Sequence, residues 1–176
     1  VQKDGAGTLT MSGDNTYSGG TTLDAGTILV THNNGLGTGA VTVNGGTLAL
    51  DSGVALSTGV TWNTSSALQG NGTYQRSADW SLPDNFTVTP GTSTGTITVD
   101  VGTGNTLTMN STTTTQIEIA AIDDFDVLSI LGNGVVDGAL EVDLLGGYEP
   151  AFGDRFNVVT ATGVLSGTVD LVGPLA

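Results

Sequence analysis

The sequence predicts an all-β solenoid of about seven or eight coils, on the evidence of a repeated triplet, alternating strands and turn-forming separators. A triplet of glycine, threonine and an aliphatic residue recurs at Gly7–Leu9, Gly26–Ile28 and Gly46–Leu48, in steps of 19 (26 − 7) and 20 (46 − 26) residues. A period of roughly 20 to 25 residues is typical of stacked coils, each of which buries its apolar face only against its neighbours.

Each triplet opens a short strand. Polar and apolar residues alternate in Thr8–Met11 and Thr47–Leu50, and nearly so in Thr27–Val30, with further alternating runs at Thr21–Leu23 and Ala40–Val43. Alternation with a period of two points one set of side chains inward and the other outward. The residues predicted to point inward are Leu9, Met11, Leu23, Ile28, Val30, Val41, Val43, Leu48 and Leu50.

The separators between these strands are rich in turn formers. They include Ser12–Asn15, Ser18–Gly20, Asn33–Gly35 and Asn44–Gly46. Glycine and asparagine tolerate the positive φ that tight corners require. No run of apolar residues at helical spacing occurs in this part of the chain. The first fifty residues therefore predict strands joined by corners.

Residues 3–50 also resemble a known family. The stretches Lys3-Asp4-Gly5-Ala6-Gly7-Thr8-Leu9 and Leu36-Gly37-Thr38-Gly39-Ala40-Val41 resemble the autotransporter-associated β-strand repeat of bacterial passenger domains and surface proteins. The resemblance implies a right-handed parallel β-helix that is secreted and displayed outside the cell. It brings no catalytic residues, because that repeat is a structural and transport-associated element.

A weaker resemblance covers residues 124–170, where Gly147-Tyr148-Glu149-Pro150-Ala151-Phe152-Gly153-Asp154 is similar to the closing segment of the same surface proteins. We therefore expect one β-helix domain over residues 1–176. It would comprise the repeat at 1–50, irregular middle coils at 51–123 and closing coils at 124–176.

Strand-like runs continue beyond the repeat. Those in the middle and closing parts are Val60–Trp62, Gly72–Tyr74, Phe86–Thr89, Gly95–Val99, Thr106–Met109, Gln116–Ala120, Asp126–Ile130, Gly138–Val142 and Gly167–Leu171.

The segment 75–83 interrupts the pattern with Arg76, Asp79, Trp80 and Pro83. One interpretation is a projecting loop that binds a glycan, because Trp and Arg are enriched at binding hot spots. The other is that Trp80 packs on the flank of the rod and Arg76 pairs with a nearby acid.

The charge balance excludes several classes of partner. Seventeen acidic residues oppose three basic ones, for a net charge of −14. Nucleic-acid binding needs clustered Lys and Arg, and anionic membranes also repel such a chain. No run is apolar and long enough to span a membrane, so we expect no membrane insertion by this segment. The acids are expected mainly to keep an extracellular rod soluble.

One acidic cluster is a candidate metal site. Asp123, Asp124 and Asp126 lie within four residues, and calcium takes six to eight oxygen ligands. Neither the EF-hand spacing nor the glycine-rich calcium-binding nonapeptide is present. The alternative is a solvated turn before a strand. No other cofactor is expected.

Enzymatic chemistry has little support. His32 is the only histidine, cysteine is absent, and no Ser-His-Asp arrangement is defensible. Paired carboxylates could cleave polysaccharides, but their separation decides that chemistry and the sequence does not give it. We therefore expect a non-enzyme.

The sequence predicts no capping helix at Val1–Gly7 or at Leu171–Ala176. A β-helix without caps presents unpaired strand edges at its ends, and such edges invite another strand. We expect an extracellular structural rod, either a surface stalk or a filament subunit. It would associate end to end or stack on neighbouring coils of a longer chain. The alternatives are an adhesin that binds carbohydrate through the loop around Trp80 and, less favoured, a polysaccharide-acting enzyme.

Overall fold

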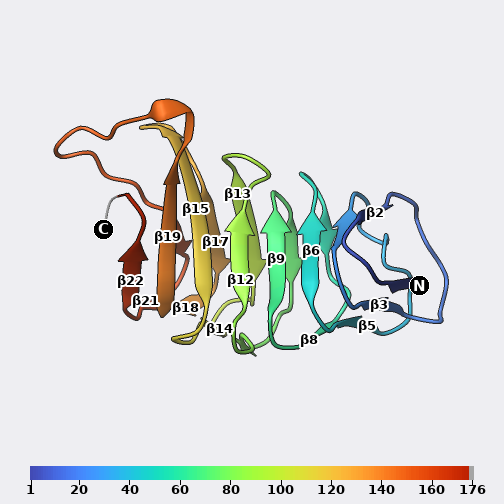
Figure 1. Ribbon diagram of the computed structural model, residues 1–176. Coiled ribbons are helices and arrows are strands. Elements are labelled where there is room, and N and C mark those ends of the chain that lie inside the picture. The colour runs from blue at the N-terminus through green and yellow to red at the C-terminus, as the bar shows by residue number, and fades with distance from the viewer. Residues whose placement is uncertain (175–176) are drawn as a thin grey trace.

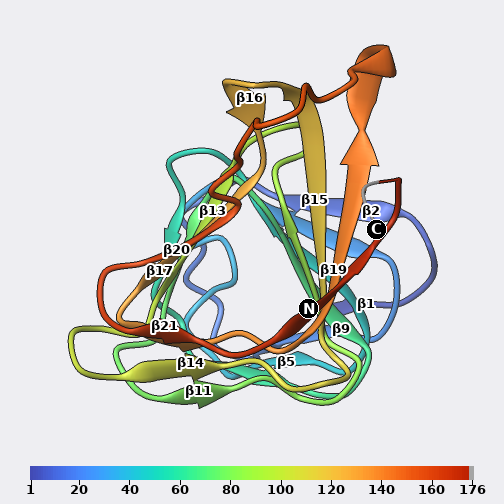
Figure 2. The ribbon, with the colours of Figure 1, turned by 90° about the vertical axis from the view of Figure 1, so that its left-hand side faces the viewer.

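The computed structural model describes residues 1–174 as a parallel β-helix (Figure 1). Each full coil runs through three strands, and strands of successive coils pair in parallel, as in Thr8–Met11 with Thr27–Val30. Viewed along the stack, three faces enclose one core (Figure 2). The all-β parallel solenoid is therefore confirmed. Apart from one short 3₁₀ helix, the described residues form only strands and connections.

The long sheet forms one face from the first coil to the last. It has nine strands, of which β16 pairs antiparallel with β15 and lies off the main stack. The strands are β2 (Thr8–Met11), β4 (Thr27–Val30), β6 (Gly46–Leu50), β9 (Ser66–Gly70), β12 (Thr87–Pro90), β15 (Thr114–Ala121), β16 (Asp124–Phe125), β19 (Gly138–Leu144) and β22 (Val169–Val172).

A second face, the short sheet, begins in the third coil. Its five strands are β7 (Ala55–Leu56), β10 (Thr73–Gln75), β13 (Thr96–Asp100), β17 (Val127–Leu131) and β20 (Val159–Ala161).

The third face, the base, is divided into two four-stranded sheets. The N-terminal base sheet holds β1 (Gln2–Lys3), β3 (Thr21–Leu23), β5 (Val41–Val43) and β8 (Val60–Trp62). The C-terminal base sheet holds β11 (Trp80–Ser81), β14 (Thr106–Thr108), β18 (Asn133–Val135) and β21 (Leu165–Ser166). β8 and β11 do not pair, and we call the break between them the seam.

The repeated triplet of the sequence is explained by the corner before the long sheet. Gly26 and Gly46 adopt φ +75° and +77°, which L side chains rarely reach. They also stack on one another, since a Cβ on Gly46 would collide with the backbone oxygen of Gly26. In these two coils glycine is needed because the corner is both left-handed and closely packed, whereas Gly7 in the first coil has neither a positive φ nor a neighbour close to its Cβ position.

The core is a set of columns that run along the rod. Alternation puts one inward residue of each strand above its partner in the next coil. One such column in the long sheet is Leu9, Ile28, Leu48, Leu68, Val88, Thr115, Leu140 and Leu171. Of the nine residues predicted to point inward, eight are buried, and Leu9 is partly buried against the same core.

Near the C-terminal end the rod carries a lateral projection. β15 and β19 run past the edge of the other strands, and β16, the 3₁₀ helix η1 (Leu145–Gly147) and the segment 148–158 cover them (Figures 1 and 2). A small second core fills the projection, with Ile117, Ile119 and Val142 buried and the rings of Phe125 and Phe156 5.4 Å apart. Within residues 1–174 no helix is long and apolar enough to cross a bilayer.

The two ends of the described rod differ. At the N-terminal end Lys3 occupies an inward position, in register with Leu23, and is 9 % exposed. Its ammonium donates to the carbonyls of Gly5 and Ala25. At the C-terminal end apolar side chains of the last strands are exposed, including Leu165, Val169, Leu171 and Val172. The first end is therefore polar and the second apolar.

Candidate functional site

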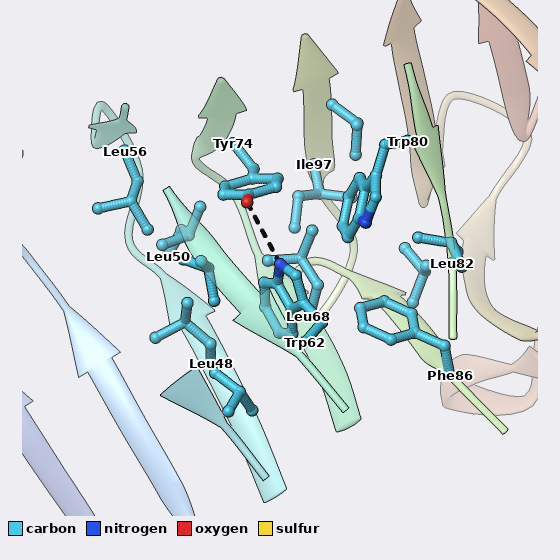
Figure 3. Packing of buried hydrophobic residues seen from close by; sticks show 14 of the residues in the cluster. Leu48, Leu50, Leu56, Trp62, Leu68, Tyr74, Trp80, Leu82, Phe86 and Ile97 are labelled. Carbon is cyan, nitrogen blue, oxygen red and sulfur yellow. Dashed lines mark hydrogen bonds between the residues drawn. The ribbon is translucent and has the colours of Figure 1, made fainter. Parts of the chain in front are cut away.

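The seam lies above an aromatic cluster that fills the core between the two base sheets. Trp62, Tyr74, Trp80 and Phe86 come from four different strands or turns and meet there (Figure 3). Their ring centroids are 5.0 to 5.8 Å apart, mostly edge to face. The Trp62 indole N–H donates to the Tyr74 hydroxyl at 3.2 Å, so this buried polar pair is satisfied.

The backbone explains why the ladder stops at the seam. Asn63 N–H donates to Val43 on the β5 side, and Leu82 N–H donates to Thr108 on the β14 side. Successive residues of a strand direct their backbone groups to opposite sides. The groups of Trp62 and Ser81 therefore face the seam, where neither β8 nor β11 has a partner strand. Pro83, two residues after Ser81, has no N–H to offer on that side.

A cavity of about 310 Å³ occupies the seam. It is lined by the whole of β8, both residues of β11, and Arg76 and Pro83. At the corner toward the long sheet the opening is closed, because Ser65 N–H donates to the carbonyl of Asp84 at 3.1 Å. The cavity therefore lies where one step of the base ladder is missing.

The structure places the three residues predicted for a binding loop at or beside this cavity. Residues 76–79 are exposed, whereas Trp80 is only 4 % exposed and belongs to the aromatic core. The Arg76 guanidinium carbon lies 5.6 Å from the centre of the Trp80 ring, in cation–π geometry. The Asp79 carboxylate accepts a hydrogen bond from a different element, the N–H of Thr106, at 2.8 Å.

The turn that carries Arg76 is fastened to the following coil. The Arg76 backbone N–H donates to the carbonyl of Asp100 at 2.8 Å, and the Asp79 bond to Thr106 secures the other side. Ser77 between them adopts φ 54°, a left-handed turn. Arg76 is thus presented by a fixed turn and not by a long loop. Whether Arg76, Asp79 and Trp80 bind a ligand stays a prediction.

The three predicted calcium ligands have separate environments. Asp126 is fully buried, and its carboxylate accepts the N–H of Gly95 at 2.7 Å and that of Glu118 at 2.8 Å. Asp124 is exposed and accepts the Thr94 hydroxyl, and Asp123 is exposed.

Within residues 1–174 no group of three or more His, Asp or Glu side chains is placed to hold a metal ion. Calcium at this turn stays a prediction.

Asp126 instead joins the projection to the rod. It links Gly95, the residue before β13, to Glu118 in the middle of β15. Burial is the largest influence on its carboxyl group and raises the pKa to about 6, although the two N–H donors favour the charged form. From the sequence this residue was predicted only as one acid of a cluster, and the fold shows that its carboxylate connects two strands inside the protein.

Comparison with known proteins identifies the N-terminal coils. Residues 1–30 match the family model of the passenger-associated-transport repeat. The match overlaps the first part of the repeat expected over residues 3–50 and confirms that resemblance. It indicates an autotransporter passenger segment. No curated protein and no solved structure matches the chain. The similarity of residues 124–170 to a closing segment stays a prediction.

The sequence did not reveal the parts of the seam that come from other coils. Trp62 was expected only as a strand residue, and Ser81 and Thr61 carried no signal of their own. The one available signal was Pro83 in the segment 75–83, because proline has no N–H to give to a ladder. It could not show that this segment and the strand at Val60–Trp62 would face each other across an unpaired gap.

Proposed function

We propose that this chain is a rigid extracellular rod segment of a bacterial passenger protein and that it associates through its C-terminal end. The observation that supports the rod is the long sheet, which continues without a break from β2 to β22. Stiffness in such a rod comes from backbone ladders and stacked inward side chains along its whole length. The passenger repeat in residues 1–30 supports secretion to the cell surface.

The C-terminal end supports the proposed association. Within residues 1–174 the last strands have no further strand on their outer edges, and Leu165, Val169 and Leu171 are exposed there. A groove of about 360 Å³ opens beside them, with Val136, Leu140 and Phe156 in its wall. Burying apolar side chains and pairing the free edges both favour a further strand layer at this end. The N-terminal end is less suited to the same contact, because Lys3 fills an inward position there with an ammonium bonded to carbonyls and not with an apolar side chain.

Sedimentation velocity and negative-stain electron microscopy of the purified chain test this proposal. Rods whose sedimentation coefficient rises with concentration are expected. Leu171 points inward at the open end, in register with Leu140, whereas Val172 points outward on the same strand. Leu171→Asp should therefore abolish association, and Val172→Asp, which adds the same charge, should leave it largely intact. A monomer at every concentration up to the millimolar range would contradict end association, and a globular particle would contradict the rod.

A further inference from the structure

The seam cavity is rich in hydrogen-bond donors, which the rod function does not require. Arg76 contributes a guanidinium, which has five N–H groups and no acceptor. Thr61 and Ser81 add hydroxyl groups, and both residues are exposed. No carboxylate lines the cavity, in a chain with seventeen acidic residues.

Trp80 supplies a further donor from within the core. Its side chain is 96 % buried, and its indole N–H makes no hydrogen bond to the other core residues drawn in Figure 3, whereas the Trp62 N–H bonds to Tyr74. No fully buried side-chain nitrogen or oxygen in that range lacks a partner, so this N–H reaches the accessible surface. The cavity is the hollow that Trp80 lines. An indole nitrogen only donates, so its partner at the surface is an acceptor oxygen of water or of a ligand.

Arg76 differs from the other two cations in having its charge available beside a cavity. The Lys3 ammonium donates its hydrogen bonds to the carbonyls of Gly5 and Ala25. Arg155 lies exposed in the segment that covers the projection and lines neither described cavity. Within the described residues no carboxylate shares the lining of the cavity with Arg76. The ring of Trp80 holds its guanidinium plane, so less side-chain entropy is lost when a ligand binds.

We propose that the seam cavity binds the carboxylate-bearing sugar unit of an acidic saccharide. Arg76 would donate to the carboxylate, in the bidentate geometry that guanidinium favours. The Trp80 N–H and the hydroxyls of Thr61 and Ser81 would bond ring or hydroxyl oxygens of the same unit. The volume of about 310 Å³ lies at the lower end of the range for small-ligand sites, roughly 300 to 1,000 Å³. This inference does not depend on end association.

The surface around the cavity favours a saccharide chain over a peptide strand. Outward hydroxyls form a column along the base face, with Thr22, Thr42 and Thr61 in register on one side of the seam and Ser81 and Thr108 on the other. A polymer of sugars can contact such a column on both sides of the cavity. A peptide strand would need a backbone ladder, but β11 offers only two residues before Pro83.

The chain's two tryptophans provide two reporters, because both line the cavity but only the Trp62 N–H is bonded within the chain. The probes are tri-galacturonate, a neutral galactose trisaccharide, tri-glutamate and acetate, each titrated at about 0.15 M salt, where distant charges are screened beyond about 8 Å. Binding is followed by calorimetry and by the indole N–H signals in ¹H–¹⁵N correlation spectra. Tri-galacturonate should shift the Trp80 signal saturably and by more than the Trp62 signal, because the Trp62 N–H is already bonded to Tyr74 although its side chain also lines the cavity.

Two charge-matched variants decide whether binding is local. Arg76→Gln removes the proposed carboxylate donor and should weaken tri-galacturonate binding by roughly tenfold or more. Arg155→Gln makes the same change in net charge at an exposed position away from the seam and should not alter binding. Equal weakening by both variants, or an unmoved Trp80 signal, would overturn the site. If the neutral trisaccharide bound as tightly as tri-galacturonate, the proposed role of the carboxylate would be wrong. If acetate or tri-glutamate bound as tightly as tri-galacturonate, the proposal that the ligand is a saccharide would be wrong.

Discussion

Truncation of Leu48 tests the assignment of inward and outward columns most directly. Leu48 is 1 % exposed and lies between Ile28 and Leu68 in the long-sheet column. Leu48→Ala removes three carbons, worth about 2.4 kcal/mol of transfer free energy at about 0.8 kcal/mol each. The backbone ladders above and below limit collapse, so a cavity contribution brings the expected loss to about 3–4 kcal/mol. Leu48→Asp should cost more, because it also buries an unpaired carboxylate.

Leu29 is the matched control, since it points outward from the neighbouring strand and is only partly buried. Leu29→Ala should cost less than about 1 kcal/mol. Urea denaturation is followed by circular dichroism and by tryptophan fluorescence, because a solenoid can unfold one part at a time. Trp62 lies in the coil next to Leu48 and reports on that part of the rod. Equal losses for the two alanine variants would refute the column assignment.

Three further predictions concern single positions. The raised pKa of Asp126 favours its protonated form in the fold, so its contribution to stability is present below about pH 4 and is lost as the pH rises through about 6. The stability of Asp126→Asn relative to the natural chain should therefore rise by on the order of 1–3 kcal/mol between pH 4 and 7. A difference in urea midpoints that does not change with pH would contradict this. Gly46→Ala should destabilise more than Gly53→Ala, since both glycines have positive φ but only Gly46 lacks space for a Cβ; equal melting temperatures would refute the packing explanation. Asn44→Ala should cost about 1–2 kcal/mol, because the Asn44 amide joins its neighbours in the coils before and after, and an unchanged urea midpoint would show that this ladder contributes nothing.

The regular part of the fold could be predicted because its signals are local. Gly26 and Gly46 mark corners that need positive φ, and the alternation of Val41–Val43 directly gives the buried face. Strand β9 gave no such signal, since Ser66–Gly70 contains one large apolar residue and forms a strand because β6 and β12 pair with it on both sides. Pairing with neighbours supplied what its own sequence lacks.

The projection shows a second limit of sequence patterns. Ile117 and Ile119 alternate with polar residues, as inward residues of the rod do, but they pack in the separate small core. The destination of their side chains depends on the length of β15, which carries its end past the edge of the other faces. That length in turn depends on the partner β19 and on Asp126, whose carboxylate satisfies the backbone N–H of Glu118. A period of two gives the face of a strand but not the core that the face meets.

The seam depends on residues that no local pattern connects. Trp80 follows exposed residues and precedes Pro83, a context typical of a loop, yet Trp62, Tyr74 and Phe86 surround it in the core. Filling the core with two indoles at adjacent levels coincides with the loss of one ladder step between β8 and β11. The same event leaves backbone groups unpaired at the surface and places Arg76 over the buried ring. A binding hollow in a solenoid can thus arise without an inserted loop, wherever side-chain bulk and a proline interrupt the pairing of successive coils.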